Sequence, residues 1–188
     1  MHKSDVTIDL STNSIEIHDS QAEPWKVTLV DTGNDTLTGG RIKRIKEHVN
    51  NETFMLTYGD GVSDVDINEL LKFHKIHGKY CTVTSVQPSG RFGALDIDVN
   101  NEVKSFIEKP RGDGAWVNGG FFICEPAIFN YIDGDTTVWE KEPMETIANQ
   151  GQMLTYKHHG FWKPMDTLRD KQELEHDWVI GQAKWKVW

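Results

Sequence analysis

Hydrophobic and polar positions alternate along much of this chain with the two-residue period that is typical of strands. This alternation, or a short apolar run between turn residues, predicts strands at residues 6–10, 14–18, 25–31, 54–58, 81–86, 94–98, 103–108, 119–124 and 153–157. Two neighbouring pairs flank short polar turns, so residues 6–18 and 94–108 are predicted to form antiparallel hairpins.

In other stretches the hydrophobic residues repeat about every 3.6 positions, which predicts helices at residues 42–49, 67–77, 126–132, 139–149 and 168–180. Asp66 can cap the second of these helices, Glu69 completes a capping box, and Gly78 ends the helix. The strand at 54–58, this helix and the strand at 81–86 follow one another as a parallel crossover requires. Together with the hairpins, they predict an α/β protein with a mixed sheet.

The charge composition of the chain argues against some classes of binding partner. The 188 residues include 29 acidic and 20 basic side chains, and the formal charge of −9 argues against a nucleic-acid surface or an anionic membrane. Cys81 and Cys124 have no metal-ligand spacing, and no apolar run has the length of a signal or a membrane span. We therefore expect one cytoplasmic domain that covers residues 1–188.

The most informative stretch is F-M-L-T-Y-G-D-G, where the apolar strand at 54–58 ends in Gly59, Asp60 and Gly61. Ligands of open α/β sheets bind at the carboxyl ends of strands, and glycines let the backbone approach a phosphate or a metal. A carboxylate at this place suits a divalent cation. G-D-G is equally an ordinary turn tripeptide, so a turn without chemistry is the alternative.

Other carboxylates and histidines have structural alternatives as well. Asp64 with Asp66, and Asp96 with Asp98, match the D-x-D pattern by which glycosyltransferases hold a metal and a sugar nucleotide. The first pair can instead cap a helix, and the second can be the polar phase of a strand. The histidines lack zinc-site partners, so we interpret them as surface residues or hydrogen-bonded core residues: His74, His77, His158 and His159.

Three further stretches combine charge with a strand or helix end. Glu108-Lys109-Pro110 can bind hydroxyls and a phosphate where a strand ends, or form an exposed ion pair. Asp166 stands before the helix at 168–180, where it or Thr167 can also serve as the cap. The basic start of the helix at 42–49 follows a glycine-containing loop, although a solvated amphipathic helix explains it too.

The order of these stretches resembles a known family. G-R-I-K-R, T-Y-G-D-G, G-R-F-G-A-L, F-I-E-K-P-R-G-D-G, V-N-G-G-F-F and P-M-D-T-L-R-D follow one another as in sugar-1-phosphate nucleotidyltransferases. More narrowly, with T-L-V-D-T-G and W-E-K-E-P, they resemble the members that transfer a cytidylyl group to glucose 1-phosphate. The resemblance implies a Rossmann-like nucleotide-diphospho-sugar transferase fold with a mixed central sheet.

The resemblance also implies an activity and the residues that carry it. The reaction would join CTP and glucose 1-phosphate into CDP-glucose and pyrophosphate, for O-antigen or deoxysugar biosynthesis, in a homo-oligomer. By resemblance, Asp60 and Asp166 bind Mg²⁺ and are catalytic with Arg41 and Lys109. Thr36, Arg41 and Gly59 would contact the nucleotide, and the sugar phosphate would contact Gly93, Glu108, Lys109, Asn118 and Gly119.

One part of the family pattern is absent from these residues. The family begins with a strand and a G-G-x-G-T-R-L loop that grips the nucleotide phosphates, and the sequence holds no such segment. We therefore expect an N-terminally truncated chain that lacks the first strands of the sheet and is inactive alone. The alternatives are a non-catalytic remnant that keeps a sugar-phosphate site or an oligomer interface, and a D-x-D glycosyltransferase.

Overall fold

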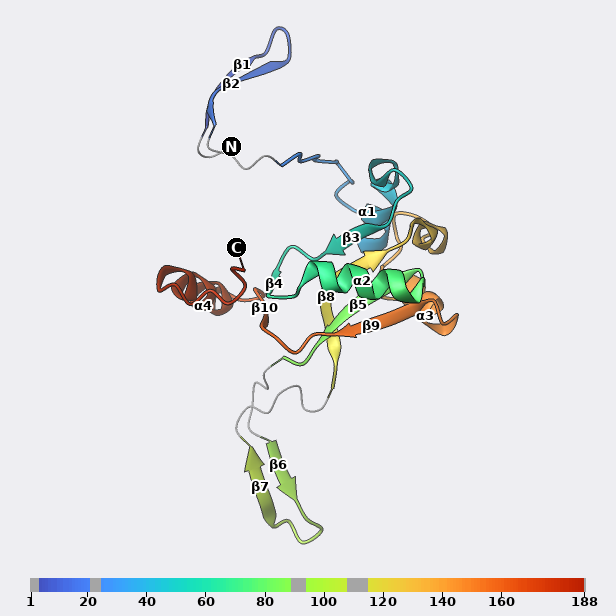
Figure 1. Ribbon diagram of the computed structural model, residues 1–188, viewed down its shortest axis with the longest axis vertical. Coiled ribbons are helices and arrows are strands. Elements are labelled where there is room, and N and C mark those ends of the chain that lie inside the picture. The colour runs from blue at the N-terminus through green and yellow to red at the C-terminus, as the bar shows by residue number, and fades with distance from the viewer. Residues whose placement is uncertain (1–3, 21–24, 89–93, 108–114, 188) are drawn as a thin grey trace. The chain divides into compact units, whose positions relative to one another are not determined.

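The computed structural model describes residues 4–20, 25–88, 94–107 and 115–187 (Figure 1). Contacts between backbone segments divide the chain into two units, Met1–Asp31 and Thr32–Trp188. The second unit holds the central sheet and every described residue of the predicted site, so most of the structural argument concerns it.

The first unit is a two-stranded hairpin. Strands β1 (Ser4–Asp9) and β2 (Ser14–Ser20) pair antiparallel, and the carboxylate of Asp9 accepts the backbone N–H of Ser11 in the turn. The hairpin predicted at residues 6–18 is thereby confirmed. The strand predicted at residues 25–31 is wrong, because none of these residues pairs with another strand among the described residues, and alternation alone cannot supply a ladder partner.

A four-stranded mixed sheet organises the second unit. Its strands are β3 (Phe54–Thr57), β5 (Cys81–Val86), β8 (Val117–Cys124) and β9 (Met153–Lys157), in the order β3-β8-β5-β9. Strand β8 is antiparallel to both of its neighbours, whereas β5 and β9 are parallel. The predicted mixed sheet is therefore confirmed.

The predicted crossover has a third strand inserted in it. Because β3 and β5 both run antiparallel to β8, they are parallel to each other and β8 lies between them (Figure 1). Helix α2 (Ile67–His77) connects them and packs against β5 and β8. The Asp66 carboxylate accepts the N–H groups of Asn68 and Glu69 at its start, which confirms the predicted cap.

The second unit also holds further helices and two pairs of short strands. The helices are α1 (Thr38–Arg44), α3 (Glu142–Asn149) and α4 (Leu168–Val179), and the 3₁₀ helices are η1 (Lys46–Val49) and η3 (Pro126–Tyr131). Strand β4 (Gly61–Ser63) pairs antiparallel with β10 (Trp162–Pro164). Strand β6 (Ala94–Ile97) pairs antiparallel with β7 (Val103–Ile107). The helix predicted at 42–49 is thus divided at Ile45. The hairpin predicted at 94–108 is confirmed within its described residues.

The core lies on both faces of the sheet because neighbouring residues of β8 point to opposite sides. Phe122 and Cys124 belong to a cluster with Trp139 and Ile128, whereas Ile123 packs with Leu70 of α2. All are buried. Helical segments therefore cover both faces of the central strands, which is the layered α/β architecture expected from the sequence.

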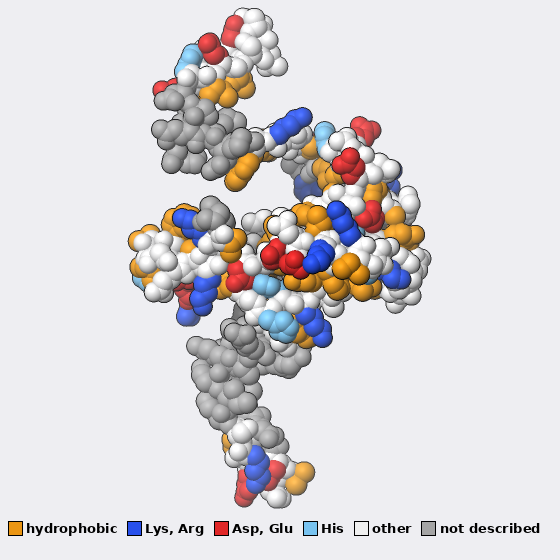
Figure 2. Space-filling model, viewed as in Figure 1, with side chains coloured by type: hydrophobic (Ala, Val, Ile, Leu, Met, Phe, Trp, Pro, Cys, Tyr) orange, Lys and Arg blue, Asp and Glu red, His pale blue; other side chains and the backbone are white. Residues whose placement is uncertain are grey.

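Charges of both signs are interspersed on the visible face of the second unit (Figure 2). Basic side chains of this unit also pair with acidic ones, as in the ion pair between Arg44 and Asp135, with 2.6 Å between nitrogen and oxygen. Among the residues described, no helix has the length and apolar character needed to cross a membrane.

Candidate active site

Strands β4 and β10 bring the two predicted metal ligands to the same place. Pro164 lies opposite Gly61 in this antiparallel pair, and one residue beyond it the backbone N–H of Met165 donates a 2.7 Å hydrogen bond to the carbonyl oxygen of Asp60. Asp60 and Asp166 therefore stand at adjoining ends of two paired strands. Both residues are exposed, as a group that meets a diffusible ligand must be.

A second connection closes the other end of this strand pair. One Asp64 carboxylate oxygen, Oδ1, accepts the backbone N–H of Phe161 at 2.7 Å and lies 2.8 Å from Nε2 of His158. A Cβ atom on Gly160 would lie only 2.3 Å from that oxygen, so the turn needs a glycine. Asp64 thus holds the segment that leads to Asp166, rather than facing a ligand.

The D-x-D residues consequently have structural partners. Asp66 caps α2, and Asp98 accepts the backbone N–H groups of Asn100 and Glu102 in the β6–β7 turn. The backbone N–H of Glu102 is the largest cause that lowers the pKa of Asp98. The side chain of Asp96 lies outside the described residues. These contacts account for three of the four D-x-D carboxylates without a ligand.

The G-D-G turn packs directly on the N-G-G stretch of β8. The backbone N–H of Tyr58 donates to the carbonyl oxygen of Gly120 at 3.0 Å. The indole N–H of Trp162 donates to the carbonyl oxygen of Gly119 at 2.8 Å. Gly120 has φ of 78°, and a Cβ atom there would lie 2.7 Å from the Tyr58 ring. A glycine is therefore required at position 120, next to the sugar-phosphate candidates Asn118 and Gly119.

A chain of side-chain hydrogen bonds extends across this junction. Nδ2 of Asn118 donates to the Tyr58 hydroxyl at 3.2 Å, and that hydroxyl donates to Oε1 of Glu140 at 2.6 Å. The hydroxyl of Thr38, the first residue of α1, donates to Oε2 of the same carboxylate at 2.8 Å. Burial, followed by the bond to Glu140, raises the pKa of Tyr58 well above its ordinary value.

Of the three predicted nucleotide residues, Thr36 lies just before α1 and Arg41 lies within it. The backbone N–H of Gly39 donates to the carbonyl oxygen of Thr137 at 2.9 Å, which fixes this helix start against the loop before Trp139. Thr36 is buried beneath it, whereas Arg41 is exposed and donates to the hydroxyl of Thr32 and, at 3.3 Å, to the carbonyl oxygen of Asn34. Arg41 is therefore held against the loop that precedes its own helix.

The donor set at Asp60 and Asp166 fits a magnesium ion. Mg²⁺ prefers hard oxygen ligands and is usually held by one or two carboxylates together with substrate phosphates and water. The described residues contain no group of three or more His, Cys, Asp or Glu side chains placed to enclose a metal. Two carboxylates at joined strand ends match a site that a phosphate ligand completes.

The remaining candidates divide between described and undescribed residues. Gly59 is exposed, and a Cβ atom added to it would have open space around it. Gly93, Glu108 and Lys109 lie outside the described residues, so their predicted contacts with the sugar phosphate stay predictions. Of the predicted site, the structure brings Asp60, Asp166, Asn118 and Gly119 into one region.

The histidines have the structural partners expected from the sequence. His74 is buried, with Nδ1 at 2.7 Å from the Thr82 hydroxyl and Nε2 at 3.1 Å from Glu125, and His77 contacts the same hydroxyl. Burial lowers the pKa of His77. His158 is the partner of Asp64. These contacts confirm the interpretation of His74, His77 and His158 as hydrogen-bonded structural residues.

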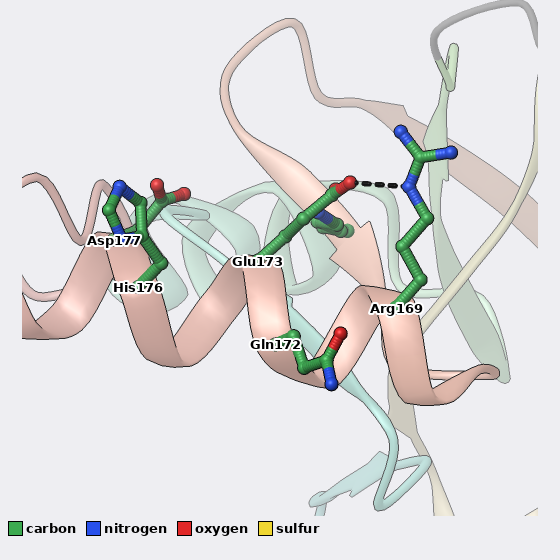
Figure 3. Close-up of a pocket in the computed structure, with 6 residues that line it drawn as sticks. Arg169, Gln172, Glu173, His176 and Asp177 are labelled. Atoms are coloured by element: carbon green, nitrogen blue, oxygen red, sulfur yellow. Dashed lines mark hydrogen bonds and ion pairs between the residues drawn. The ribbon is translucent and has the colours of Figure 1, made fainter.

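A surface pocket of about 480 Å³ lies beside α4 (Figure 3). Three of its charged groups are paired, since Glu173 accepts from Lys163 of β10 and, at 2.8 Å, from Arg169 of its own helix. None of the predicted site residues lines it, and its lining consists of Lys163, Arg169, Gln172, Glu173, His176 and Asp177. The pocket is therefore a feature of α4 and β10.

Comparison with known proteins identifies the family. The profile described as nucleotidyl transferase matches residues 13–168. The chain belongs to the nucleotidyl transferase family. It is 54% identical over 189 aligned residues to a glucose-1-phosphate cytidylyltransferase of Salmonella typhi, and the alignment covers 100% of this chain and 73% of that protein. A second glucose-1-phosphate cytidylyltransferase, from Salmonella typhimurium strain LT2, shows the same identity and coverage.

Solved structures support the fold assignment. The crystal structure of HddC from Yersinia pseudotuberculosis aligns with a TM-score of 0.58 at 20% identity, over 77% of this chain and 64% of that one. The likeness confirms the predicted nucleotidyltransferase fold, and at this identity it concerns the fold alone.

Sequence reasoning missed the residues that connect the predicted parts of the site. Tyr58 was noted only as the end of an apolar strand, Glu140 only as part of the W-E-K-E-P stretch, and Thr38 was given no role. The Glu140 carboxylate is 82 residues from Tyr58 and 102 residues from Thr38 in the chain, so no local spacing signals their contact. The available signals were the position of Tyr58 directly before G-D-G and the place of Glu140 in W-E-K-E-P.

Proposed function

We propose that this protein, in its complete form, transfers a cytidylyl group from CTP to α-D-glucose 1-phosphate and releases pyrophosphate. The 54% identity to glucose-1-phosphate cytidylyltransferase, over the whole of this chain, is the observation that carries the proposal. The chain spans 73% of that relative's length and 64% of the HddC chain. A non-catalytic remnant or a D-x-D glycosyltransferase is not favoured by these matches.

The chemistry needs positioning and charge neutralisation more than proton transfer. A phosphate oxygen of glucose 1-phosphate attacks the α-phosphorus of CTP, and the bond to the pyrophosphate oxygen breaks. Both partners are anionic, so the protein must hold like charges together. In the proposed site, Asn118 and Gly119 contact the sugar phosphate, and Arg41 and Thr36 contact the nucleotide.

Asp60 and Asp166 are the residues proposed to hold Mg²⁺. Their placement at adjoining ends of β4 and β10, next to the sugar-phosphate candidate Gly119, supports this assignment. When bound, the ion supplies positive charge that offsets the phosphates. Lys109 and Glu108 are proposed, by family resemblance alone, to meet the sugar phosphate.

The cellular setting is part of the proposal. Cys81 and Cys124 are free thiols whose sulfur atoms lie 4.0 Å apart across β5 and β8, which supports a reducing cytoplasm. The product, a nucleotide-activated sugar, suits a role in O-antigen or deoxysugar biosynthesis. We also propose a homo-oligomer, which sedimentation of the purified protein tests.

A fusion protein provides the decisive experiment. The 188 residues are joined to the part of the Salmonella typhi relative that the alignment leaves out, and the fusion is assayed with CTP, UTP, dTTP and ATP in the presence of glucose 1-phosphate and Mg²⁺. We expect CDP-glucose and pyrophosphate, with CTP preferred. A clear preference for another nucleotide refutes the cytidylyl assignment, and dependence on a different divalent ion refutes the magnesium assignment.

A further inference from the structure

Glu140 is an acceptor in two hydrogen bonds that join three separate segments. Its Oε1 accepts from the hydroxyl of Tyr58, at the end of β3, and its Oε2 accepts from that of Thr38, at the start of α1. Asn118 of β8 joins through Tyr58. These three segments carry the proposed metal, nucleotide and sugar-phosphate residues, so one carboxylate connects all three sides of the site.

Backbone groups at both ends fix the direction of every hydrogen bond in this chain. At one end the N–H of Gly120 donates to Oδ1 of Asn118 at 2.8 Å, and at the other the N–H of Trp139 donates to the Thr38 hydroxyl at 2.9 Å. Backbone N–H groups only donate and an ionised carboxylate only accepts. Asn118 must therefore present its amide nitrogen to Tyr58, and both hydroxyls must donate to Glu140.

With the hydrogen bonds in these directions, one N–H of the Asn118 amide is available on the proposed sugar-phosphate side of the site. The Asn118 amide nitrogen carries two hydrogens, and Tyr58 takes one of them. No acceptor among the described residues takes the other, and Asn118 is exposed. A hydroxyl or phosphate oxygen of a sugar 1-phosphate is a matching acceptor.

We propose that Glu140 is a positioning residue: acting through Tyr58, it holds the Asn118 amide with one N–H available to a sugar 1-phosphate. This inference rests on the proposed function for the identity of the ligand. It assigns a role to a residue of the W-E-K-E-P stretch, to which the sequence analysis gave none. Without the carboxylate, the Tyr58 hydroxyl is free to donate elsewhere, and the Asn118 amide loses the partner that fixes its orientation.

Binding of glucose 1-phosphate to the 188-residue chain, measured by titration calorimetry, tests this role. We expect Glu140→Ala to weaken binding about tenfold, the effect of one hydrogen bond to a polar ligand. Glu140→Gln should stay within about threefold, because its amide oxygen still accepts from Tyr58 and its amide nitrogen can donate to Thr38. Tyr58→Phe keeps the ring on Gly120 and should resemble Glu140→Ala. Glu142→Ala, an exposed carboxylate nearby, is the matched control.

A nuclear magnetic resonance measurement on the ligand-free chain separates positioning from general stability. The two side-chain hydrogens of Asn118, assigned by their loss in Asn118→Asp, should give distinct sharp signals in the unaltered protein and in Glu140→Gln. In Glu140→Ala they should broaden or shift while backbone signals of β5 and β9 stay in place. A purely structural role would instead move the backbone signals of the whole sheet.

The outcomes distinguish the two proposals. If the unaltered chain binds glucose 1-phosphate and Glu140→Ala binds equally well, or if the Asn118 signals do not change, the role of Glu140 is overturned and the proposed function stands. If the unaltered chain binds no glucose 1-phosphate, the proposed function is weakened. The Asn118 signals then still decide whether Glu140 orients this amide.

Discussion

The backbone N–H of Met165 donates a 2.7 Å hydrogen bond to the carbonyl oxygen of Asp60, which lies 105 positions earlier in the sequence. The bond continues the antiparallel pairing of β4 with β10 by one residue. It places Asp166, the next residue, beside the G-D-G turn. The two carboxylates proposed to hold Mg²⁺ are therefore joined through the backbone, which limits how far they can separate.

Loss of the Asp60 charge should affect rate more than stability. We expect Asp60→Asn to lower the kcat of the fusion enzyme by at least ~100-fold, the scale of one transition-state electrostatic contact. The thermal unfolding midpoint should change little, because Asp60 is exposed and its carbonyl bond to Met165 is kept. Steady-state kinetics and thermal unfolding of the same preparation measure both.

Asp133→Asn is the control for this substitution, since Asp133 is also exposed and lies outside the proposed site. It should leave kcat within about twofold of the unaltered value, as surface changes away from special features usually do. Normal turnover by Asp60→Asn, accompanied by a large fall in the unfolding midpoint, would show that Asp60 is only a turn residue.

The 188-residue chain by itself should bind glucose 1-phosphate without turning over CTP. Asn118 and Gly119 already lie against the G-D-G turn, so part of the proposed sugar side is formed. These residues contain no glycine-rich loop of the G-G-x-G-T-R-L type to hold the triphosphate. Calorimetry with glucose 1-phosphate and a pyrophosphate-release assay measure the two properties. Robust pyrophosphate release by the chain would mean that Asp60, Asp166 and Arg41 suffice.

The glycine beside Asp64 should be sensitive to a single methyl group. In Gly160→Ala the new Cβ atom would lie 2.3 Å from Oδ1 of Asp64 and 2.6 Å from Cε1 of His158, two groups that are held by each other. We expect a loss of about 1–3 kcal/mol in the free energy of unfolding, typical of overpacking. Urea unfolding followed by circular dichroism measures it.

Gly134→Ala is the matched control, because a Cβ atom at Gly134 meets no atom within 4 Å. It should be neutral or slightly stabilising, since alanine restricts the unfolded chain. Equal unfolding free energies for the two variants would show that the loop relaxes freely around Gly160, and that the contact between Asp64 and His158 contributes little to the pairing of β4 with β10.

The stability of the α4 region should fall in acid. Hydrogen bonds from Lys163 and then Arg169 lower the pKa of Glu173 to about 2 from its ordinary value of 4.5. A carboxyl group with a depressed folded pKa stabilises the protein above its unfolded pKa, and this contribution is lost as the pH falls through the folded value. The loss should therefore occur between about pH 4.5 and 2.

Glu173→Gln should flatten this part of the pH dependence, whereas Glu175→Gln, on the same helix, should leave it unchanged. Because Glu173 is at the surface, the effect is modest and should shrink in high salt. Thermal unfolding across this pH range, at low and high salt, measures it. An identical acid profile for Glu173→Gln and the unaltered chain would contradict the assignment.

Local patterns of the sequence determined most of the secondary structure. The strands at 81–86 and 153–157 were predicted at their observed bounds, and the cap at Asp66 and the ending at Gly78 were correct. These features depend on neighbouring residues: side-chain alternation, a carboxylate beside free N–H groups, and a glycine at φ of 61°. The predicted strand at 25–31 failed because a strand also needs a partner.

Tertiary structure decided how those pieces make a site. The sequence alone, through its ordered motifs, pointed to Asp60, Asp166 and Asn118 and to the family. It could not show that β8 enters between β3 and β5, that β4 pairs with β10, or that Glu140 joins Tyr58 to Thr38. Each of these contacts links residues distant in the chain, and such contacts are selected by the packing of the whole core rather than by local propensity.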